Sequence, residues 1–189
     1  MKAAESTVNP ADERDIWSAT ILYHDAAARE RAVLVCDHLV RAFLREIEFQ
    51  FHWWRTDFLE DAGMAAAAAD DAARAEFLIV SCPPAFESTP AVRFWLEECA
   101  VRRAGREGAL IDLTGGNLAP TPATERTRGY LRGFARRATM DYLAQFPRGR
   151  FLSGFESMMA PALQAVRLPT ALEDAQHPLP PPSHFGLNE

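Results

Sequence analysis

The run FLIVS, residues 77–81, constrains the fold of this chain more than any other stretch, because four large apolar side chains follow one another in it. A strand with one solvent-facing side alternates apolar and polar residues, and this run does not alternate. Both of its sides must therefore be covered, which is typical of a central strand in a parallel sheet with helices on each face. The sequence predicts an α/β domain built around this strand.

Four further segments have the length and composition of strands, and segments with helical periodicity separate them. Strands are expected at 19–24, 47–54, 109–114 and 140–144, and helices at 26–44, 60–74, 89–105, 122–138 and 155–166. Strands that alternate with helices favour right-handed crossovers and a parallel sheet. We therefore expect a three-layer, doubly wound, flavodoxin-like fold with five strands in the order 2-1-3-4-5.

The segment 47–54, IEFQFHWW, alternates an apolar side with a polar side and is expected at the sheet edge. Trp53 lies on the apolar side, so we expect it in the core. Trp54 lies on the polar side and is expected to cover the edge of a site or to hold a helix or the tail, with a partner for its indole N–H. Arg55 is expected to stack on its neighbour or to pair with Asp57.

The two ends of the chain differ in composition from its middle. Residues 1–15 are polar and are expected to form a flexible arm, and residues 16–168 form the predicted domain. Residues 169–189 are rich in proline and end in PPPSHFGLNE. We expect this tail to pack on the domain or on a partner, since prolines reduce the entropy that an extended segment loses on docking.

Charge and cysteine usage limit the classes of partner and the cell compartment. The net charge of -6 opposes binding to polyanions, so nucleic acid is not an expected partner. The three cysteines are widely spaced, without a C-x-x-C pair, and the histidines show no H-x-x-x-H spacing, so neither a disulfide framework nor a metal site is expected. No apolar run reaches the roughly 18 residues of a membrane span. We expect a cytoplasmic protein that does not enter a membrane.

In a doubly wound sheet, ligands bind beyond the carboxyl ends of the strands, where the strand order reverses. The candidate ligand-binding residues are those that follow the predicted strands, and no catalytic residue is predicted among them: His24, Asp25, Trp54, Arg55, Ser81, Cys82, Thr114 and Asn117. Cys82 is considered as a nucleophile, but a small thiol at a packed strand end is more often inert. We nevertheless expect Cys82 to react with thiol reagents faster than Cys36 and Cys99.

Charged residues on two predicted helices admit a functional and a structural interpretation. Arg128, Arg132 and Arg136 recur every fourth residue and could bind an anion, although a solvated helix face is the favoured interpretation. Glu97 and Glu98 follow a tryptophan as in the helix that carries the catalytic glutamate of TIR-type NAD hydrolases, but paired glutamates usually face solvent.

The segment FLIVSCPPAFESTPAVRFWLEE resembles the third strand, loop and helix of flavodoxin-like proteins. Flavodoxins bind the phosphate of FMN with a loop rich in Ser, Thr and Gly after the first strand, whereas this chain has HDAAARERA there. Response-regulator receivers share the fold, and Asp25 and Thr114 match their pattern. Ser81 and Cys82 stand in place of the phosphoacceptor aspartate, and MDYLAQF supplies no lysine. The resemblance therefore implies the fold and no cofactor.

The whole chain is similar to an uncharacterised family of small bacterial proteins that share FHWWR-type and D-F-L segments and end in a PPSHWGINE-like tail. Here the corresponding ending is PPPSHFGLNE. The resemblance implies a domain of this family and adds no chemistry.

Two function classes follow from these patterns. The first is a non-catalytic flavodoxin-like or receiver-like domain that binds a protein partner or a small ligand. The second is a nucleotide- or flavin-dependent enzyme that uses the crevice at the carboxyl ends of the strands. The oligomeric state and the cofactor, if any, are not determined by the sequence.

Overall fold

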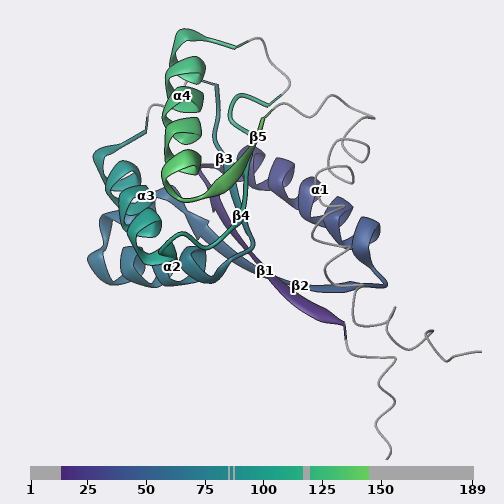
Figure 1. Cartoon of the computed structure of the whole chain (residues 1–189). Helices are drawn as coiled ribbons and strands as arrows, with labels where there is room; N and C mark the ends of the chain where they lie inside the picture. The colour runs from purple at the N-terminus through teal and green to yellow at the C-terminus, as the bar shows by residue number, and fades with distance from the viewer. Residues whose placement is uncertain (1–13, 85, 87, 117–119, 145–189) are drawn as a thin grey trace, which may run out of the picture. The chain divides into compact units, whose positions relative to one another are not determined.

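The computed structural model describes residues 14–84, 86, 88–116 and 120–144, and the structural statements below concern these residues. In chain order the elements are β1 (Asp15–Tyr23), α1 (Ala26–Phe43), β2 (Ile47–Arg55), the 3-10 helix η2 (Thr56–Glu60), α2 (Ala62–Arg74), β3 (Phe77–Ser81), α3 (Pro90–Arg103), β4 (Gly108–Asp112), α4 (Pro122–Arg137) and β5 (Met140–Ala144). The strands form one parallel sheet in the order β2-β1-β3-β4-β5 (Figure 1). The predicted α/β fold and strand order are confirmed.

Helices cover both faces of the sheet. Helix α1 lies on one face, and α2, α3 and α4 lie on the other (Figure 1). On the second face, a large cluster of buried side chains joins these three helices to Leu22, Leu78 and Leu110 of the central strands. Trp95 and Phe134 are the largest side chains of this core, and both are almost fully buried. Each would contribute several kcal/mol of hydrophobic stabilisation, about 25 cal/mol for each Å² of apolar surface removed from water.

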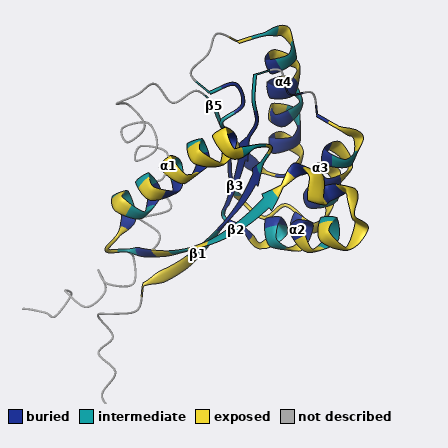
Figure 2. Cartoon of the chain, turned by 180° about the vertical axis from the view of Figure 1, so that it is seen from behind, coloured by how far each residue is buried: buried dark blue, intermediate teal, exposed yellow. Residues whose placement is uncertain are grey.

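Strand β3, which contains the apolar run FLIVS, is central in the sheet. All five residues of β3 are buried, and β3 pairs with β1 on one side and β4 on the other. In Figure 2 this part of the sheet is coloured as buried, while the outer faces of the helices are coloured as exposed. The unbroken apolar run is therefore a consequence of cover on both faces.

Side-chain caps fix the beginning of each α-helix. Asp25, Asp61, Thr89 and Thr121 each accept a hydrogen bond from the backbone N–H three residues later. Pro90 follows Thr89 at the first helical position, where the missing N–H of proline has no consequence. The predicted start of this helix near Thr89 is confirmed. One helix expected at 60–74 begins instead after Asp61, because a separate 3-10 turn occupies Thr56–Glu60.

Strands β1 and β2 are longer than the other three. Each has nine residues, paired without interruption from Asp15 with Ile47 to Tyr23 with Arg55, whereas β3, β4 and β5 have five residues each. Strand β1 thus begins at Asp15, four positions before the predicted start. Its first residues extend beyond β3, and the Ile16 side chain is 60% exposed. The first two residues of β1 are coloured as exposed in Figure 2.

The structure contradicts the expectation that Trp53 lies in the core. Both tryptophans are half-buried. Trp53 contacts Tyr23 and Arg29 near the outside of the sheet, whereas Trp54 packs against the large core beneath α2. The apolar side of β2 is covered only in part because β2 is the last strand, so alternation identified the two sides of β2 but not their burial.

Helical spacing of the apolar residues predicts that Val33, Cys36, Val40, Phe43 and Leu44 form the apolar face of α1, and this is wrong in part. Cys36 and Phe43 are buried, but Val33 and Leu44 are exposed, and Ala28, Ala32 and Leu39 are buried instead. The small alanines allow α1 to approach β3 closely enough for Ser81 Oγ to donate a hydrogen bond to the Ala28 carbonyl oxygen at 2.8 Å. The helix predicted at 155–166 and the tail lie outside the described residues.

Candidate functional site

A hollow of about 500 Å³ lies at the carboxyl ends of β1 and β2. Its lining comprises Tyr23, His24, Asp25, Ala26, Arg29, Arg55, Thr56 and Asp57. The structure therefore brings together three of the predicted ligand-binding residues, His24, Asp25 and Arg55. The parallel direction of β1 and β2 explains this, since both strands end at the same edge of the sheet.

His24 connects the end of β1 to neighbouring segments. Its ring Nδ1 lies 2.9 Å from Thr56 Oγ1, and its ring packs 4.9 Å from that of Phe86. Its backbone N–H donates to the carbonyl oxygen of Ser81. The ring and the backbone of His24 thus connect the end of β1 to the segments that contain Thr56, Phe86 and Ser81.

Asp25 places a carboxylate at the amino end of α1. Its Oδ1 accepts a hydrogen bond of 2.7 Å from the backbone N–H of Ala28. The first turn of a helix is where phosphate groups bind in many α/β proteins, because free N–H groups and the helix dipole attract anions. Here the negative charge of Asp25 already lies in that position, so this helix end repels a second anion.

Arg55 and Asp57 form a bidentate ion pair at the rim of the hollow. Arg55 Nε and Nη2 donate to the two carboxylate oxygens of Asp57 at 2.6 and 2.5 Å. This hydrogen bonding holds the pKa of Asp57 below its ordinary value. The predicted pairing of Arg55 with Asp57 is confirmed, and in addition the guanidinium lies 5.0 Å from the ring centre of Phe58.

A second arginine lies over an aromatic ring on the same side. The guanidinium of Arg29 is 5.2 Å from the ring centre of Trp53, and Tyr23 makes an edge contact with Trp53 at 6.2 Å. We call Tyr23, Arg29, Trp53, Arg55 and Phe58 the aromatic–arginine surface. These five residues come from β1, α1, β2 and η2.

Ser81 and Cys82 lie below the surface. Both are fully buried, and the hydroxyl of Ser81 is engaged by α1 as described above. Burial, together with the nearby carboxylate of Asp112, raises the pKa of the Cys82 thiol. A thiol that is buried and protonated does not act as a nucleophile. The premise of the expected faster reaction, that Cys82 lies beside a cleft, is contradicted, because Cys82 is buried like Cys36 and Cys99.

Thr114 is also buried, and sequence reasoning missed the residues around it. Its backbone N–H donates to Asp112 Oδ1 at 2.8 Å, and Tyr142 Oη donates to Asp112 Oδ2 at 2.6 Å. Burial and this carboxylate raise the pKa of Tyr142. Arg128 donates to the carbonyl oxygen of Thr114 at 3.0 Å and is almost fully buried. The solvated face expected for Arg128 is wrong, although Arg132 and Arg136 are exposed.

Asp112 ends the otherwise apolar stretch ALID, residues 109–112, and could have indicated a buried carboxylate, since polar groups in a core require hydrogen-bond partners. Asn117, the last predicted ligand-binding residue, lies outside the described residues.

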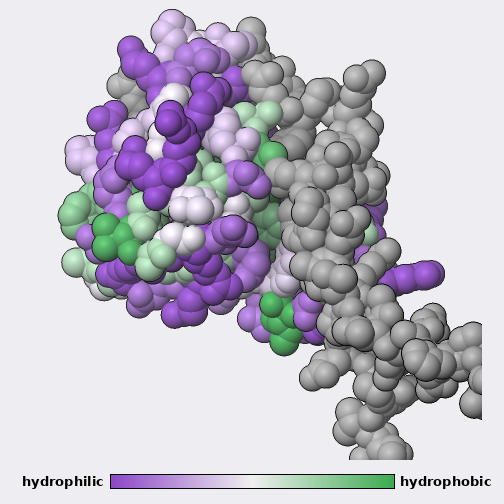
Figure 3. All heavy atoms as spheres, in the orientation of Figure 1, coloured by the Kyte–Doolittle hydropathy of each residue, from purple (hydrophilic) through white to green (hydrophobic). Residues whose placement is uncertain are grey.

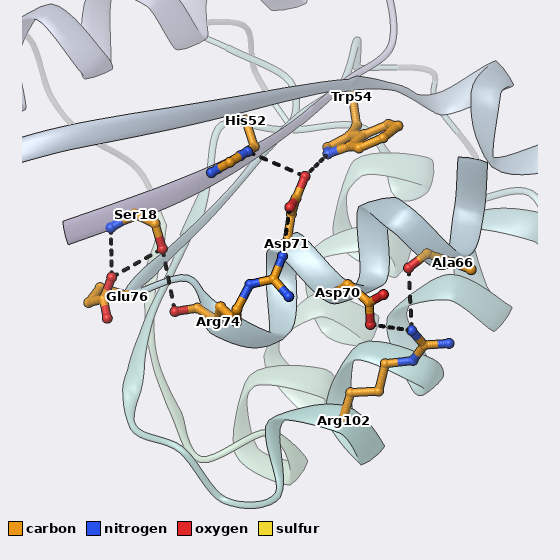
Figure 4. Close-up of polar contacts among 9 residues, drawn as sticks. All are labelled: Ser18, His52, Trp54, Ala66, Asp70, Asp71, Arg74, Glu76 and Arg102. Carbon is orange, nitrogen blue, oxygen red and sulfur yellow. Dashed lines mark hydrogen bonds and ion pairs between the residues drawn. The ribbon is translucent and has the colours of Figure 1, made fainter. Parts of the chain in front are cut away.

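Trp54 lies on the opposite face of β2 from the aromatic–arginine surface, beside α2. Its indole N–H donates to Asp71 Oδ2 at 3.1 Å, as Figure 4 shows. The same carboxylate accepts a hydrogen bond from Arg74, and its Oδ2 lies 3.4 Å from His52 Nδ1. The expectation that Trp54 holds a helix and finds a partner for its N–H is confirmed. The alternative, that Trp54 covers the hollow, is not supported, because Trp54 does not line it.

A smaller hollow of about 300 Å³ lies between α2 and α3. Alanines of α2 and the rings of Phe94 and Trp95 line most of it. In Figure 3, hydrophobic side chains gather on this side of the molecule within a surface that is otherwise largely hydrophilic. None of the predicted site residues lies there.

No described group of three or more His, Cys, Asp or Glu side chains has the arrangement of a metal site. Among the described helices, none is both long and apolar enough to cross a membrane. Comparison with known proteins found no matching family model, no similar curated protein and no similar solved structure.

Proposed function

We propose that this chain is a non-catalytic α/β domain that binds a protein partner through the aromatic–arginine surface. The observation that carries the proposal is the composition of this surface. Three aromatic rings and two arginines make up this surface, and three of the five residues, Tyr23, Arg29 and Arg55, line the hollow at the edge of the sheet. Tyr, Trp, Phe and Arg are the residues most enriched in protein interfaces and in their energetic hot spots.

The arrangement of the charged groups supports a binding role over a catalytic one. Asp25 caps α1, Arg55 is paired with Asp57, and the Cys82 thiol is buried. General acid–base or nucleophilic catalysis requires a group that reaches the substrate and can change its protonation state. Asp25 and Cys82 are therefore engaged in the fold, whereas Arg29, Arg55 and Phe58 are exposed and Tyr23 and Trp53 are half-buried.

A nucleotide- or flavin-dependent enzyme is the second candidate, and it receives less support. The fold favours it, because ligands of this kind bind at the same edge of doubly wound sheets. The carboxylate of Asp25 at the start of α1 opposes it, since that is where a phosphate would bind.

A photo-cross-linking amino acid tests the proposal most directly. Introduced in place of Phe58, which is 40% exposed on the aromatic–arginine surface, it is expected to form a discrete adduct with another protein in native cells. Introduced in place of Phe94, which is 67% exposed on α3, it is expected to form none. Equal labelling from both positions would show that the adducts arise by random collision and would contradict the proposal.

Charge reversal supplies the matched pair of variants. Arg55→Glu is expected to abolish the adduct, whereas Arg41→Glu, which reverses an exposed arginine paired with Asp37 on α1, is expected to leave it unchanged.

A parallel thermal-stability screen with FMN, NAD and ATP tests the second candidate. A ligand at 100 times its dissociation constant adds about 2.7 kcal/mol to stability. Such a gain, lost in Arg55→Glu, would favour the nucleotide-dependent enzyme instead.

A further inference from the structure

The outer edge of β2 carries backbone groups that no described strand pairs with. Strand β2 is the last strand in the sheet order, and its only described neighbour is β1. A strand at a sheet edge presents a row of N–H and C=O groups along its free side. In β2 this row extends over nine residues, Ile47–Arg55.

Edge strands of monomeric proteins usually carry features that prevent pairing, such as proline, inward lysine, a bulge or short length. Strand β2 contains no proline, glycine or lysine, and its pairing with β1 is continuous over all nine positions. It also presents the half-buried rings of Phe49 and Phe51. A long, regular, aromatic edge of this kind is suited to pairing with another strand.

We propose that β2 pairs in antiparallel fashion with β2 of a second copy of this chain, about a two-fold axis at Gln50. The side-chain pattern is self-complementary in this register. Phe49 lies opposite Phe51 of the second copy, and Ile47 lies opposite the second copy's Trp53, so apolar residues meet on one face. Aromatic and aliphatic cross-strand pairs of this kind stabilise antiparallel sheets.

Hydrogen-bonding complementarity on the other face supports the same register. Glu48 is exposed and lies opposite His52 of the second copy, and symmetry produces this pair twice. His52 has one ring nitrogen, Nδ1, near Asp71, and the other points away from it (Figure 4). The second nitrogen is therefore not engaged by Asp71.

The register leaves Arg55 and Phe58 outside the paired segment, which ends at Trp53. A dimer would thus join two sheets into one of ten strands and carry two copies of most of the aromatic–arginine surface. The inference does not rest on the proposed function, because the free edge of β2 and the pattern of its side chains are independent of what that surface binds.

The mass of the full chain in solution, measured by light scattering from 1 to 100 µM, tests the proposal. We expect a dimer whose dissociation constant rises on the order of tenfold in Glu48→Lys, because both cross-strand pairs with His52 lose their carboxylate acceptor. The matched control is Asp141→Lys, which makes the same change on β5 at the opposite edge of the sheet and is expected to leave the mass unchanged. A monomer at 100 µM would overturn the proposal, as would equal effects of the two variants.

A cysteine at the two-fold axis tests the register. Residues directly opposite each other in an antiparallel pair have Cα atoms about 4.5 to 5.5 Å apart, within the range of a disulfide. Gln50→Cys is therefore expected to form a cross-linked dimer on mild oxidation. Glu48→Cys is expected to form none, since its two copies would lie four positions apart, or about 13 Å along the strand. The native cysteines are buried and do not interfere. Cross-linking through Glu48→Cys rather than Gln50→Cys would overturn the register.

Discussion

Arg103, at the end of α3, is the basis of a stability prediction that can be worked out from its hydrogen bonds. Its side chain is 3% exposed. One terminal nitrogen donates to the carbonyl oxygens of Ala72 and Ala75 at 2.8 Å each, and the other donates to those of Arg106 and Glu107 at 3.0 and 2.9 Å. One guanidinium thus holds the end of α2 and the turn between α3 and β4, where helix carbonyls otherwise lack donors.

Arg103→Met keeps most of the buried volume and removes all four hydrogen bonds. The carbonyl oxygens of Ala72 and Ala75 then lie buried without this donor, and each such loss costs about 1 to 3 kcal/mol. Relief from burying a charged group offsets part of this sum, since burial also lowers the pKa of Arg103. We expect a net loss of about 3 kcal/mol in the free energy of unfolding.

Urea denaturation followed by tryptophan fluorescence measures this loss. With a slope of about 2 kcal/mol per M, the midpoint is expected to fall by roughly 1.5 M. Arg102→Met is the control, because the contacts of the neighbouring Arg102 are exposed: ion pairs with Asp70 and Glu98 and a hydrogen bond to the carbonyl oxygen of Ala66. It is expected to shift the midpoint little. A small effect of Arg103→Met, or an equal effect of the two substitutions, would refute the reasoning.

Three further predictions use the same assay. Gly108→Ala is expected to destabilise the fold by about 2 kcal/mol, since the added Cβ would lie 2.6 Å from the backbone oxygen of Glu76. Gly129→Ala, with open space around it, is expected to stabilise α4 by up to about 1 kcal/mol. Equal effects of the two substitutions would show that the Glu76 contact is easily relaxed. Trp54→Ala is expected to cost about 3 kcal/mol and more than Trp53→Ala, because only Trp54 packs on the main core, and the reverse order would restore the sequence-based assignment. Burial raises the pKa of the Cys82 thiol, so the folded state keeps a proton that the unfolded chain loses above the ordinary thiol pKa of about 8.5. The free energy of unfolding is therefore expected to fall as the pH rises beyond that value, and to fall less steeply in Cys82→Ala. Identical slopes would contradict the last prediction.

The arrangement of the strands could be predicted from the sequence because each strand carries a local signal. The apolar run Phe77–Ser81 requires cover on two faces, and Met140–Ala144 was placed with both of its ends correct. The pairing of Arg55 with Asp57 is likewise local, since the two residues are two positions apart.

The burial of particular side chains could not be predicted in the same way, because it depends on segments that are distant in the sequence. Arg103 resembles any arginine near a helix end, and only the carbonyl groups of α2, about 30 positions earlier, explain its burial. Trp53 was expected in the core because alternation defines the sides of a strand and gives no information on how far a helix extends over them. The role of Cys82 depended on the depth of the strand end, for which the sequence contains no local signal.

The position of β1 in the sheet has a consequence for synthesis of the chain. Strand β1 precedes both of its partners in the sequence, and Phe77, the first residue of β3, follows its partner Ala19 by 58 positions. At a translation rate of roughly 5 to 20 residues per second, the edge of β1 that faces β3 waits about 3 to 12 s for its partner to be made. During this interval the segment Ala19–Leu22 of β1, which is buried in the folded domain, has α1 and later β2 as the segments able to shield it. Slow codons or a ribosome-bound chaperone between residues 47 and 77 would thus act while this segment lacks β3.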